Sequence, residues 1–319
     1  MWMLLSGLLL GWSLGANHTA NVFGTGVATG TVSYRAAILL TAVFVALGAF
    51  LEGPKCMSTV GALSRLTAMD AFHCALAAGI MMSLLTFLSF PGSASQAIVG
   101  AVIGAGILSG TADFSKLYKV VVCWVFTPFL SILASFTFYR LFRYVLDMID
   151  ASLTQRNLIY SVGTILIGCY GAYCLGANNV ANVTGVYVGS GVLSPFAASL
   201  IGGFSIAIGV LTYSKKVMMT VGKGIAPLDP FSALVAVFAG AFTMHVFTQV
   251  GVPVSSSQAA VGAVVGVGIV GDIQTVSIRM LTKIVVGWVS APAFAALLTC
   301  LFIKLDRMGG FAAFFEIFR

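Results

Sequence analysis

Charge is scarce in this sequence. Only 16 Lys or Arg and 9 Asp or Glu occur among 319 residues, or 8%, whereas a soluble domain carries about 25% charged residues. Hydrophobic residues make up 59% of the chain and its mean hydropathy is +1.05. So few charges cannot solvate a globule of this size, and we therefore expect a multi-pass protein of the cell membrane, with the lipid bilayer as its main partner.

The few charges also limit the chemistry. Nine acidic residues exclude most metal-dependent hydrolases and acid/base carbohydrate chemistry. No nucleophile–base pair or set of metal ligands recurs in the apolar segments, so we do not expect an enzyme. The formal net charge of +7 does not indicate a nucleic-acid partner, because the basic residues stand at the ends of apolar segments, as in cytoplasmic loops.

The chain contains nearly the same sequence twice. GANHTAN at 15–21 recurs as GANNVAN at 176–182, an offset of 178 − 17 = 161. PGSASQA at 91–97 recurs as PVSSSQA at 253–259, an offset of 253 − 91 = 162. At an offset of 283 − 119 = 164, Lys119, Trp124 and Pro128 recur as Lys283, Trp288 and Pro292. These ordered matches indicate a duplication, with a first repeat over 1–150 and a second over 151–319.

Each half predicts the same series of elements. They are an apolar segment interrupted by the Asn motif (1–30; 158–190), a long helix (36–51; 195–213), a basic loop (55–65; 215–223), another helix (70–90; 231–250), a short apolar run (95–108; 257–270) and a last long helix (116–142; 277–303). The short runs are too brief to span a bilayer and predict re-entrant half-helices, whose irregular ends must be buried or line a cavity.

The expected fold class is an all-α polytopic membrane protein. It has two inverted repeats with broken and re-entrant helices and about 10–12 membrane segments. Basic residues in both internal loops leave the number of crossings open. The link over 140–156 holds three basic residues among its five charges, which favours the cytoplasmic face.

Serines precede both short runs. At the start of a helix, hydroxyl groups, free N–H groups and the positive end of the helix dipole converge, and together they bind small anions. Ordinary N-capping would explain one such run, but the duplication favours a substrate site. Its candidate residues are Ser93, Ser95 and Gln96 in the first half, and Ser255, Ser256, Ser257 and Gln258 in the second.

The asparagines of the duplicated motif are spaced four apart. Asn17 and Asn21 therefore share one helical face, as do Asn178 and Asn182. Asn is costly in lipid and faces a partner or a cavity. Packing between helices is one explanation, but the duplication favours coordination of substrate or of a coupling cation, with Asn17 and Asn178 beside that ion.

These motifs resemble the PiT-type inorganic phosphate transporters. The resemblance rests on GANxxAN in each half, on the P-V-S-S-S-Q segment and on the K-x4-W-x3-P helix, and it covers nearly the whole chain. It implies a secondary transporter with inverted repeats, in which the serines bind the oxyanion and the Asn motifs help to form cation sites. Bound Na⁺ is the only cofactor that we would expect, and a homodimer is compatible with the sequence.

The chain departs from the family pattern at four positions. His18 and Asn179 stand where the family usually has Asp, and Gln96 and Gln258 stand where it usually has His. The loss of carboxylates leaves sodium only neutral oxygen ligands. His18 is an alternative proton carrier, since imidazole titrates near neutral pH, although a structural role explains it equally well.

The same departure affects the choice of substrate. Hydrogen phosphate can donate a hydrogen bond to a carboxylate, whereas sulfate only accepts, so a site without carboxylates tolerates sulfate. The family also includes sulfate permeases. We predict a secondary active transporter of a tetrahedral oxyanion, with phosphate slightly favoured, coupled to Na⁺ or H⁺ by alternating access. The alternatives are a proton-coupled sulfate permease and, with less support, an anion channel.

Four further residues have structural explanations. Lys119 and Lys283 each precede a Trp by five residues, a pattern typical of snorkelling beside an interfacial aromatic anchor, although they could also balance the charge of the anion. His73 and His245 are 245 − 73 = 172 residues apart, which does not match the repeat, so we predict a structural role for both.

Overall fold

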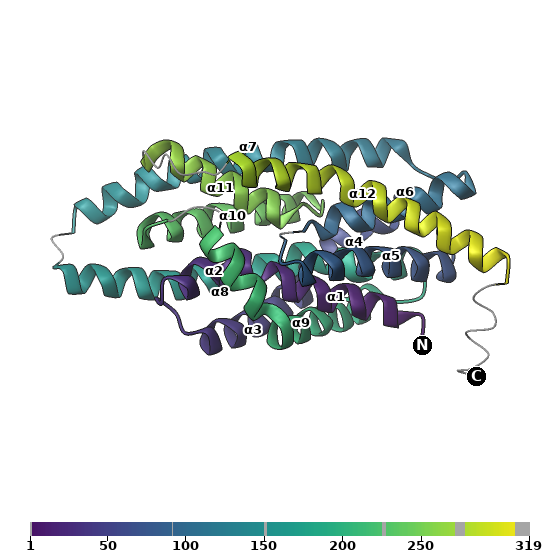
Figure 1. Cartoon of the computed structure of the whole chain (residues 1–319), viewed down its shortest axis with the longest axis horizontal. Helices are drawn as coiled ribbons and strands as arrows, with labels where there is room; N and C mark the ends of the chain where they lie inside the picture. The colour runs from purple at the N-terminus through teal and green to yellow at the C-terminus, as the bar shows by residue number, and fades with distance from the viewer. Residues whose placement is uncertain (1, 91, 150–151, 225–227, 272–277, 310–319) are drawn as a thin grey trace.

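A computed structural model describes the chain except residues 1, 91, 150–151, 225–227, 272–277 and 310–319 (Figure 1). The boundary expected between the repeats, at 150 and 151, and Pro91 of the Ser motif lie outside the described residues. The described part folds into twelve helices and contains no β-strand. They are α1 (Leu4–His18), α2 (Ala20–Ala28), α3 (Tyr34–Glu52), α4 (Pro54–Gly61), α5 (Ala68–Phe87), α6 (Ala94–Ser109), α7 (Phe114–Asp147), α8 (Leu153–Gly189), α9 (Pro195–Gly224), α10 (Pro230–Val250), α11 (Ser256–Gly271) and α12 (Ile278–Arg307).

The helices fall into two length classes. By length and composition, seven are long and apolar enough to cross a membrane, namely α3, α5, α7, α8, α9, α10 and α12. The helices α6 and α11 are apolar but have only 16 residues each. Both begin and end within one residue of the predicted half-helices, so the prediction of two short apolar helices is confirmed.

The two short helices follow equivalent turns. The chain turns after α5 at Ser89 (φ 58°) and after α10 at Gly251 (φ 78°), and 251 − 89 = 162 is the offset of the repeat. In both halves this turn leads through an extended segment into the short helix. Figure 1 shows α6 and α11 running in opposite directions from the middle of the molecule, so their N-termini lie in its interior.

Helices of each half pack against helices of the other half. The helix α1 packs on α9 and α3 packs on α8, while α7 packs on α11 and α12 packs on α6. The first helix of each half thus contacts the second crossing of the other, and the last helix of each contacts the short helix of the other. A two-fold relation between inverted repeats would give this pattern, and the inverted arrangement remains our prediction.

Four glycines allow the central helices to touch. A Cβ at Gly48 or Gly176 would overlap a backbone carbonyl oxygen across the α3–α8 contact, and a Cβ at Gly15 or Gly209 would do so across the α1–α9 contact. The two contacts are copies of each other, because 176 − 15 and 209 − 48 both equal 161. Small residues at a contact let membrane helices approach to backbone distance.

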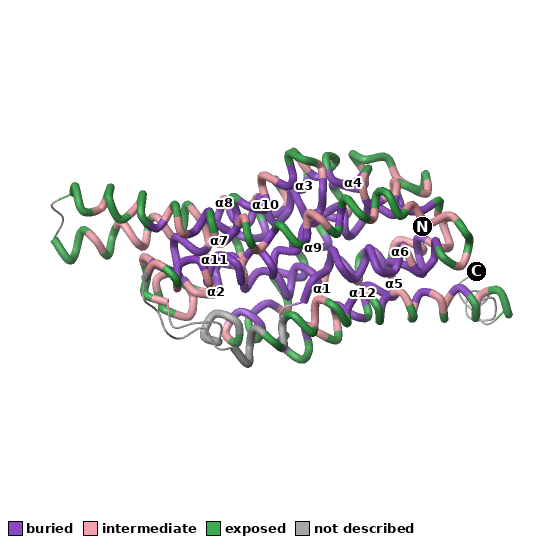
Figure 2. The backbone as a smooth tube through the Cα atoms, turned by 90° about the horizontal axis from the view of Figure 1, so that it is seen from above, coloured by how far each residue is buried: buried purple, intermediate pink, exposed green. Residues whose placement is uncertain are grey.

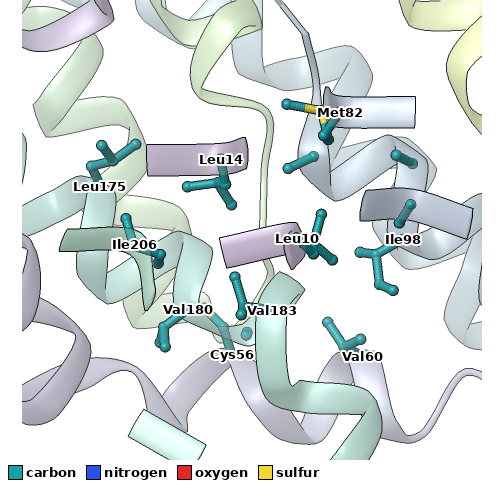
Figure 3. Close-up of a cluster of buried hydrophobic side chains, with 14 of the residues drawn as sticks. Leu10, Leu14, Cys56, Val60, Met82, Ile98, Leu175, Val180, Val183 and Ile206 are labelled. Atoms are coloured by element: carbon teal, nitrogen blue, oxygen red, sulfur yellow. The ribbon is translucent and has the colours of Figure 1, made fainter. Parts of the chain in front are cut away.

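The buried residues form a band through the middle of the molecule, and exposed residues cover its outer faces (Figure 2). Figure 3 shows how Leu10 and Leu14 of α1 lie among side chains from α4, α5, α6, α8 and α9. The core therefore joins both halves, so the repeats form one body rather than two independent domains.

The structure corrects two expectations about the elements. Only the first Asn motif interrupts a helix: α1 ends at His18 and α2 begins at Ala20, whereas α8 is continuous. At the break, the Thr19 hydroxyl donates to the Gly15 carbonyl oxygen (2.5 Å) and competes with the helical ladder. The equivalent residue, Val180, has no hydroxyl.

The prediction of loops at the two basic segments is also wrong. Residues 54–61 form α4, and residues 215–223 belong to α9. Lysine has a good helix propensity and a long stem that carries its charge away from an apolar helix, so basic residues did not mark loops here.

We expect Gly48→Ala to destabilise the protein. The new Cβ would meet the Tyr173 carbonyl oxygen and force α3 away from α8, at a cost of about 1–3 kcal/mol. The matched control is Gly287→Ala, because no atom lies within 4 Å of a Cβ at that position. A thermal unfolding midpoint in detergent should fall for the first variant only; equal midpoints for the two would refute the close α3–α8 contact.

Candidate functional site

The serine segments form the N-termini of α6 and α11. The hydroxyl of Ser93 accepts from the Gln96 backbone N–H (3.4 Å), and that of Ser255 accepts from the Gln258 N–H (3.3 Å). Ser93 also lies 3.3 Å from the Ser95 hydroxyl, and Ser255 lies 2.9 Å from the Ser257 hydroxyl. Each serine pair thus sits directly over the free N–H groups of a first helical turn.

This cluster of hydroxyl groups is buried. All five predicted serines are at most 2% exposed, although a buried hydroxyl without full partners is costly. The free N–H groups of a helix start carry the positive end of the dipole and attract an anion without a full positive charge. Two such starts in the interior can therefore hold an anion away from bulk water.

The first asparagine of each motif holds the segment that leads into the short helix. The Nδ2 of Asn17 donates to the Phe90 carbonyl oxygen (2.9 Å) and the Thr86 hydroxyl (3.2 Å), and its Oδ1 accepts from the Gly92 N–H (3.1 Å). We call this arrangement the asparagine clamp.

The second half repeats the clamp atom for atom. Asn178 donates to the Val252 carbonyl oxygen (3.3 Å) and the Thr248 hydroxyl (3.0 Å), and accepts from the Val254 N–H (2.9 Å). The partner residues are offset by 162 from those of Asn17. Both amide groups contact the loop, and the placement of Asn17 and Asn178 beside a coupling ion stays a prediction.

The other motif residues face inward. The Nδ2 of Asn21 lies 3.4 Å from the Ser256 hydroxyl, which brings α2 of the first half to α11 of the second. Asn182 donates to the Asn179 Oδ1 (3.1 Å). The residue equivalent to Ser256 is Ala94, because 256 − 162 = 94, so the contact of Asn21 has no copy at Asn182.

Several buried polar atoms of these residues have no protein partner. Burial without a partner costs about 1–3 kcal/mol for each such atom, so such a group in a native fold indicates a ligand or a functional role. The atoms are His18 Nδ1, Gln96 Oε1, Asn179 Nδ2, Asn182 Oδ1 and Gln258 Oε1. Three of them belong to the Asn motifs, one in the first half and two in the second, and the other two are equivalent glutamine oxygens of the two halves.

A cavity reaches this region. Asn21 and Ser256 line it together with mainly apolar residues of α2, α10 and α11. Thr25 lines both this cavity and a smaller neighbouring one, which adds Thr29 and Thr164. The two cavities together lead from the site toward the end of α2.

Sequence reasoning missed the threonines of this path. The signal for Thr25 and Thr29 was the continuation of the Asn spacing, because Asn21, Thr25 and Thr29 follow one another every four residues along α2 and its C-cap and so share one helical face.

The helices α7 and α12, which carry the repeated Lys and Trp, each place a tryptophan beside the second serine segment. The Trp124 indole N–H donates to the Pro253 carbonyl oxygen (3.4 Å), and that of Trp288 donates to the Ser257 hydroxyl (3.3 Å). These indoles support the second serine segment and are not interfacial anchors. Lys119 is exposed, and the side chain of Lys283 lies outside the described residues.

A metal ion would find few strong ligands. Within the described part of the chain, no three His, Cys, Asp or Glu residues gather as a ligand set. Amide and hydroxyl oxygens are therefore the ligands that the site itself offers to a cation.

A polytopic helical fold with two short apolar helices whose starts are buried, and a cavity that reaches Ser256 of one of them, is typical of a membrane transporter. The profile of the Phosphate transporter family matches residues 14–299. The chain belongs to this family.

Individual relatives agree with that assignment. The Methanocaldococcus jannaschii protein named "Putative phosphate permease MJ0630" is 28% identical over 89% of this chain and 90% of its own length. The sulfate permease CysP of Bacillus subtilis is 27% identical over 95% of this chain and 88% of its own length. A solved structure, the sodium-dependent phosphate transporter, is similar in fold, with a TM-score of 0.84, 23% identity and coverage of 97% of this chain and 100% of that chain.

We expect Asn178→Ala to loosen the segment before α11. The change leaves the Val254 N–H and the Val252 carbonyl oxygen without their partner, at a cost of about 1–3 kcal/mol for each buried group. Hydrogen–deuterium exchange should become faster at 252–255 and the unfolding midpoint should fall. Asn157→Ala, at an exposed position of α8, is the control. Unchanged exchange in Asn178→Ala would contradict the clamp.

Proposed function

We propose that this chain is a secondary active transporter that carries a small tetrahedral oxyanion across the membrane, with inorganic phosphate favoured, in symport with a cation. The observation that carries the proposal is the pair of buried serine-capped helix starts at α6 and α11. Membership of the Phosphate transporter family supports the same class of substrate.

The donors fit a compact anion. Hydroxyl groups and first-turn N–H groups are short, fixed donors, and charge-assisted hydrogen bonds from them to an anion are stronger than neutral ones. Asn21 adds an amide donor beside Ser256. A site made of neutral donors can release its anion, as a transporter must, because no fixed cation holds it.

The glutamine oxygens favour phosphate over sulfate. At neutral pH phosphate carries at least one P–OH group that needs an acceptor, whereas sulfate has only acceptors. Gln96 Oε1 and Gln258 Oε1 are buried acceptors without a partner, at equivalent positions of the two short helices. They can take the role that a carboxylate would have. Sulfate is the second candidate, because the site holds no carboxylate and CysP, a sulfate permease, is among the relatives.

The cavity supports alternating access. It lies on the side where α2 ends and α10 begins, at the same end of the molecule as the link between α7 and α8 (Figure 1). The adjoining ends of α7 and α8 carry Arg140, Arg143 and Arg156, which favours the cytoplasm. The conformation described here would therefore admit the anion from the cytoplasmic side.

Ser256→Ala tests the serine site. Removal of a hydroxyl that donates to an anion costs about 1.5–3 kcal/mol, so the apparent affinity for phosphate should fall about 10- to 100-fold. Uptake of labelled phosphate into proteoliposomes measures it, with Ser152→Ala as the control, because Ser152 only caps the exposed start of α8. If affinity and rate in Ser256→Ala equal those of the wild type, the serine assignment is wrong.

The glutamines should set the preference between anions. In the double variant Gln96→Met and Gln258→Met, phosphate loses its acceptors, and its uptake should fall about three- to tenfold relative to sulfate uptake in the same vesicles. Competition between labelled phosphate and unlabelled sulfate measures the ratio. An unchanged ratio would show that these oxygens do not bind the P–OH group.

A further inference from the structure

Among the described carboxylates, Glu52 and Asp306 each lie beside a histidine, Glu52 at 3.3 Å from the His245 Nε2 and Asp306 at 3.9 Å from the His73 Nε2. Asp70, Asp113 and Asp229 cap helix starts, and Asp147 is exposed beside Arg143. Glu52 instead ends α3, where a negative charge is unfavourable next to the negative end of the helix dipole. Its side chain is only 18% exposed, and Glu52 also lies just before the N-cap of α4, Gly53.

Four donors from three helices surround the Glu52 carboxylate. The Tyr173 hydroxyl donates to Oε1 (2.9 Å), and the Gln249 amide donates to Oε2 (2.7 Å). The Lys55 Nζ and the His245 Nε2 lie 3.2 Å and 3.3 Å from the same Oε2. A metal cation needs oxygen lone pairs, and here the oxygens already face N–H and O–H groups. The ion that this network can still take up is a proton.

His245 offers the place for that proton. Its Nε2 faces Glu52, and its Nδ1 lies 2.8 Å from the Tyr170 hydroxyl. When Nε2 carries the hydrogen, Nδ1 has a free lone pair that accepts from Tyr170. A proton taken from water then forms the Nδ1–H bond, and the Tyr170 O–H turns toward the Cys174 thiol, which it also contacts. Release reverses these steps, and no other bond forms or breaks.

The duplication provides an internal comparison. The positions offset by 161 or 162 from Glu52, Tyr173, His245 and Gln249 hold Tyr213, Trp12, Ser83 and Phe87. There, the three aromatic rings pack together with centroids 5.4–6.2 Å apart. The fold therefore packs this location without a carboxylate or a histidine in one half, although Lys216, the equivalent of Lys55, donates there to the Phe87 carbonyl oxygen (3.1 Å).

The network adjoins the substrate site. His245 lies one turn before Thr248 on α10, and Thr248 accepts a hydrogen bond from the clamp residue Asn178. On the other side, Cys56 follows Glu52 by four residues, and its sulfur lies 3.9 Å from the Asn178 Nδ2. A positive charge on His245 would strengthen the attraction between α10 and Glu52 of α3. This contact lies near the turn that leads from α10 to the serines at the start of α11.

We infer that the Glu52–His245 pair binds and releases the coupling proton of oxyanion transport. The inference rests on the proposed transport function and names the coupling ion and its residues. The titratable groups that face the pair from the surrounding helices are Lys55 and Cys56 of α4 and Tyr170, Tyr173 and Cys174 of α8.

The test uses proteoliposomes with labelled phosphate outside and a pH-sensitive dye inside. For the wild type, we expect uptake driven by an inward proton gradient and accompanied by acidification of the interior. Glu52→Gln should accumulate at least tenfold less phosphate under the gradient, yet should still exchange internal for external phosphate, because exchange needs no net proton release. His245→Gln should behave in the same way, and Asp147→Asn, which removes an exposed carboxylate, should match the wild type.

Four other outcomes would contradict the inference. If Glu52→Gln and His245→Gln accumulate phosphate with the wild-type ratio of protons to anions, the inference is wrong. It is also wrong if both variants keep the wild-type unfolding midpoint but lose exchange, or if wild-type uptake follows a sodium gradient without proton movement, although the transport function then stands. If the wild type carries neither phosphate nor sulfate, the proposed function fails and the inference fails with it.

Discussion

The rest of the structure depends on the asparagine clamp. Inside a bilayer every backbone polar group must find a partner within the protein, so a chain that stops a helix at mid-depth needs a side chain that replaces the lost ladder. Asn17 and Asn178 each supply one donor group and one acceptor to the extended segments after α5 and α10. Because these segments are satisfied, the N-termini of α6 and α11 can lie in the interior, with their free N–H groups available to an anion.

Three of the differences between the two halves lie at or near the candidate site. Thr19 interrupts the first motif helix where Val180 leaves the second continuous. Ser256 meets Asn21 where Ala94 offers no hydroxyl, and Glu52 stands where the other half has Tyr213. These differences leave the shared clamp unchanged.

Much of this framework could be predicted from the sequence, because the duplicated motifs and the apolar run lengths are local signals. They gave the short helices to within one residue and the serine cluster at their starts. The role of Asn17 and Asn178 could not be predicted in this way. Their spacing shows a shared face, but whether that face meets a ligand or a loop depends on packing.

The contact between His245 and Glu52 could not be predicted for a different reason. The position of His245 does not match the repeat, which led to the prediction of a structural role, but its partner Glu52 lies 193 residues away in sequence, and no local pattern joins the two. The basic segments were wrongly predicted to be loops for a third reason. The long stem of lysine carries its charge away from an apolar helix, so the helix can continue through a basic segment.

The most direct test of the central claim is a structure determined with a heavier isostere of each anion, arsenate for phosphate and selenate for sulfate, with anomalous scattering to place it. The account predicts one peak between the N-termini of α6 and α11, within hydrogen-bond distance of the Ser93–Ser95 and Ser255–Ser257 hydroxyls. A peak at the surface lysines of α9, with none between these helix starts, would contradict it.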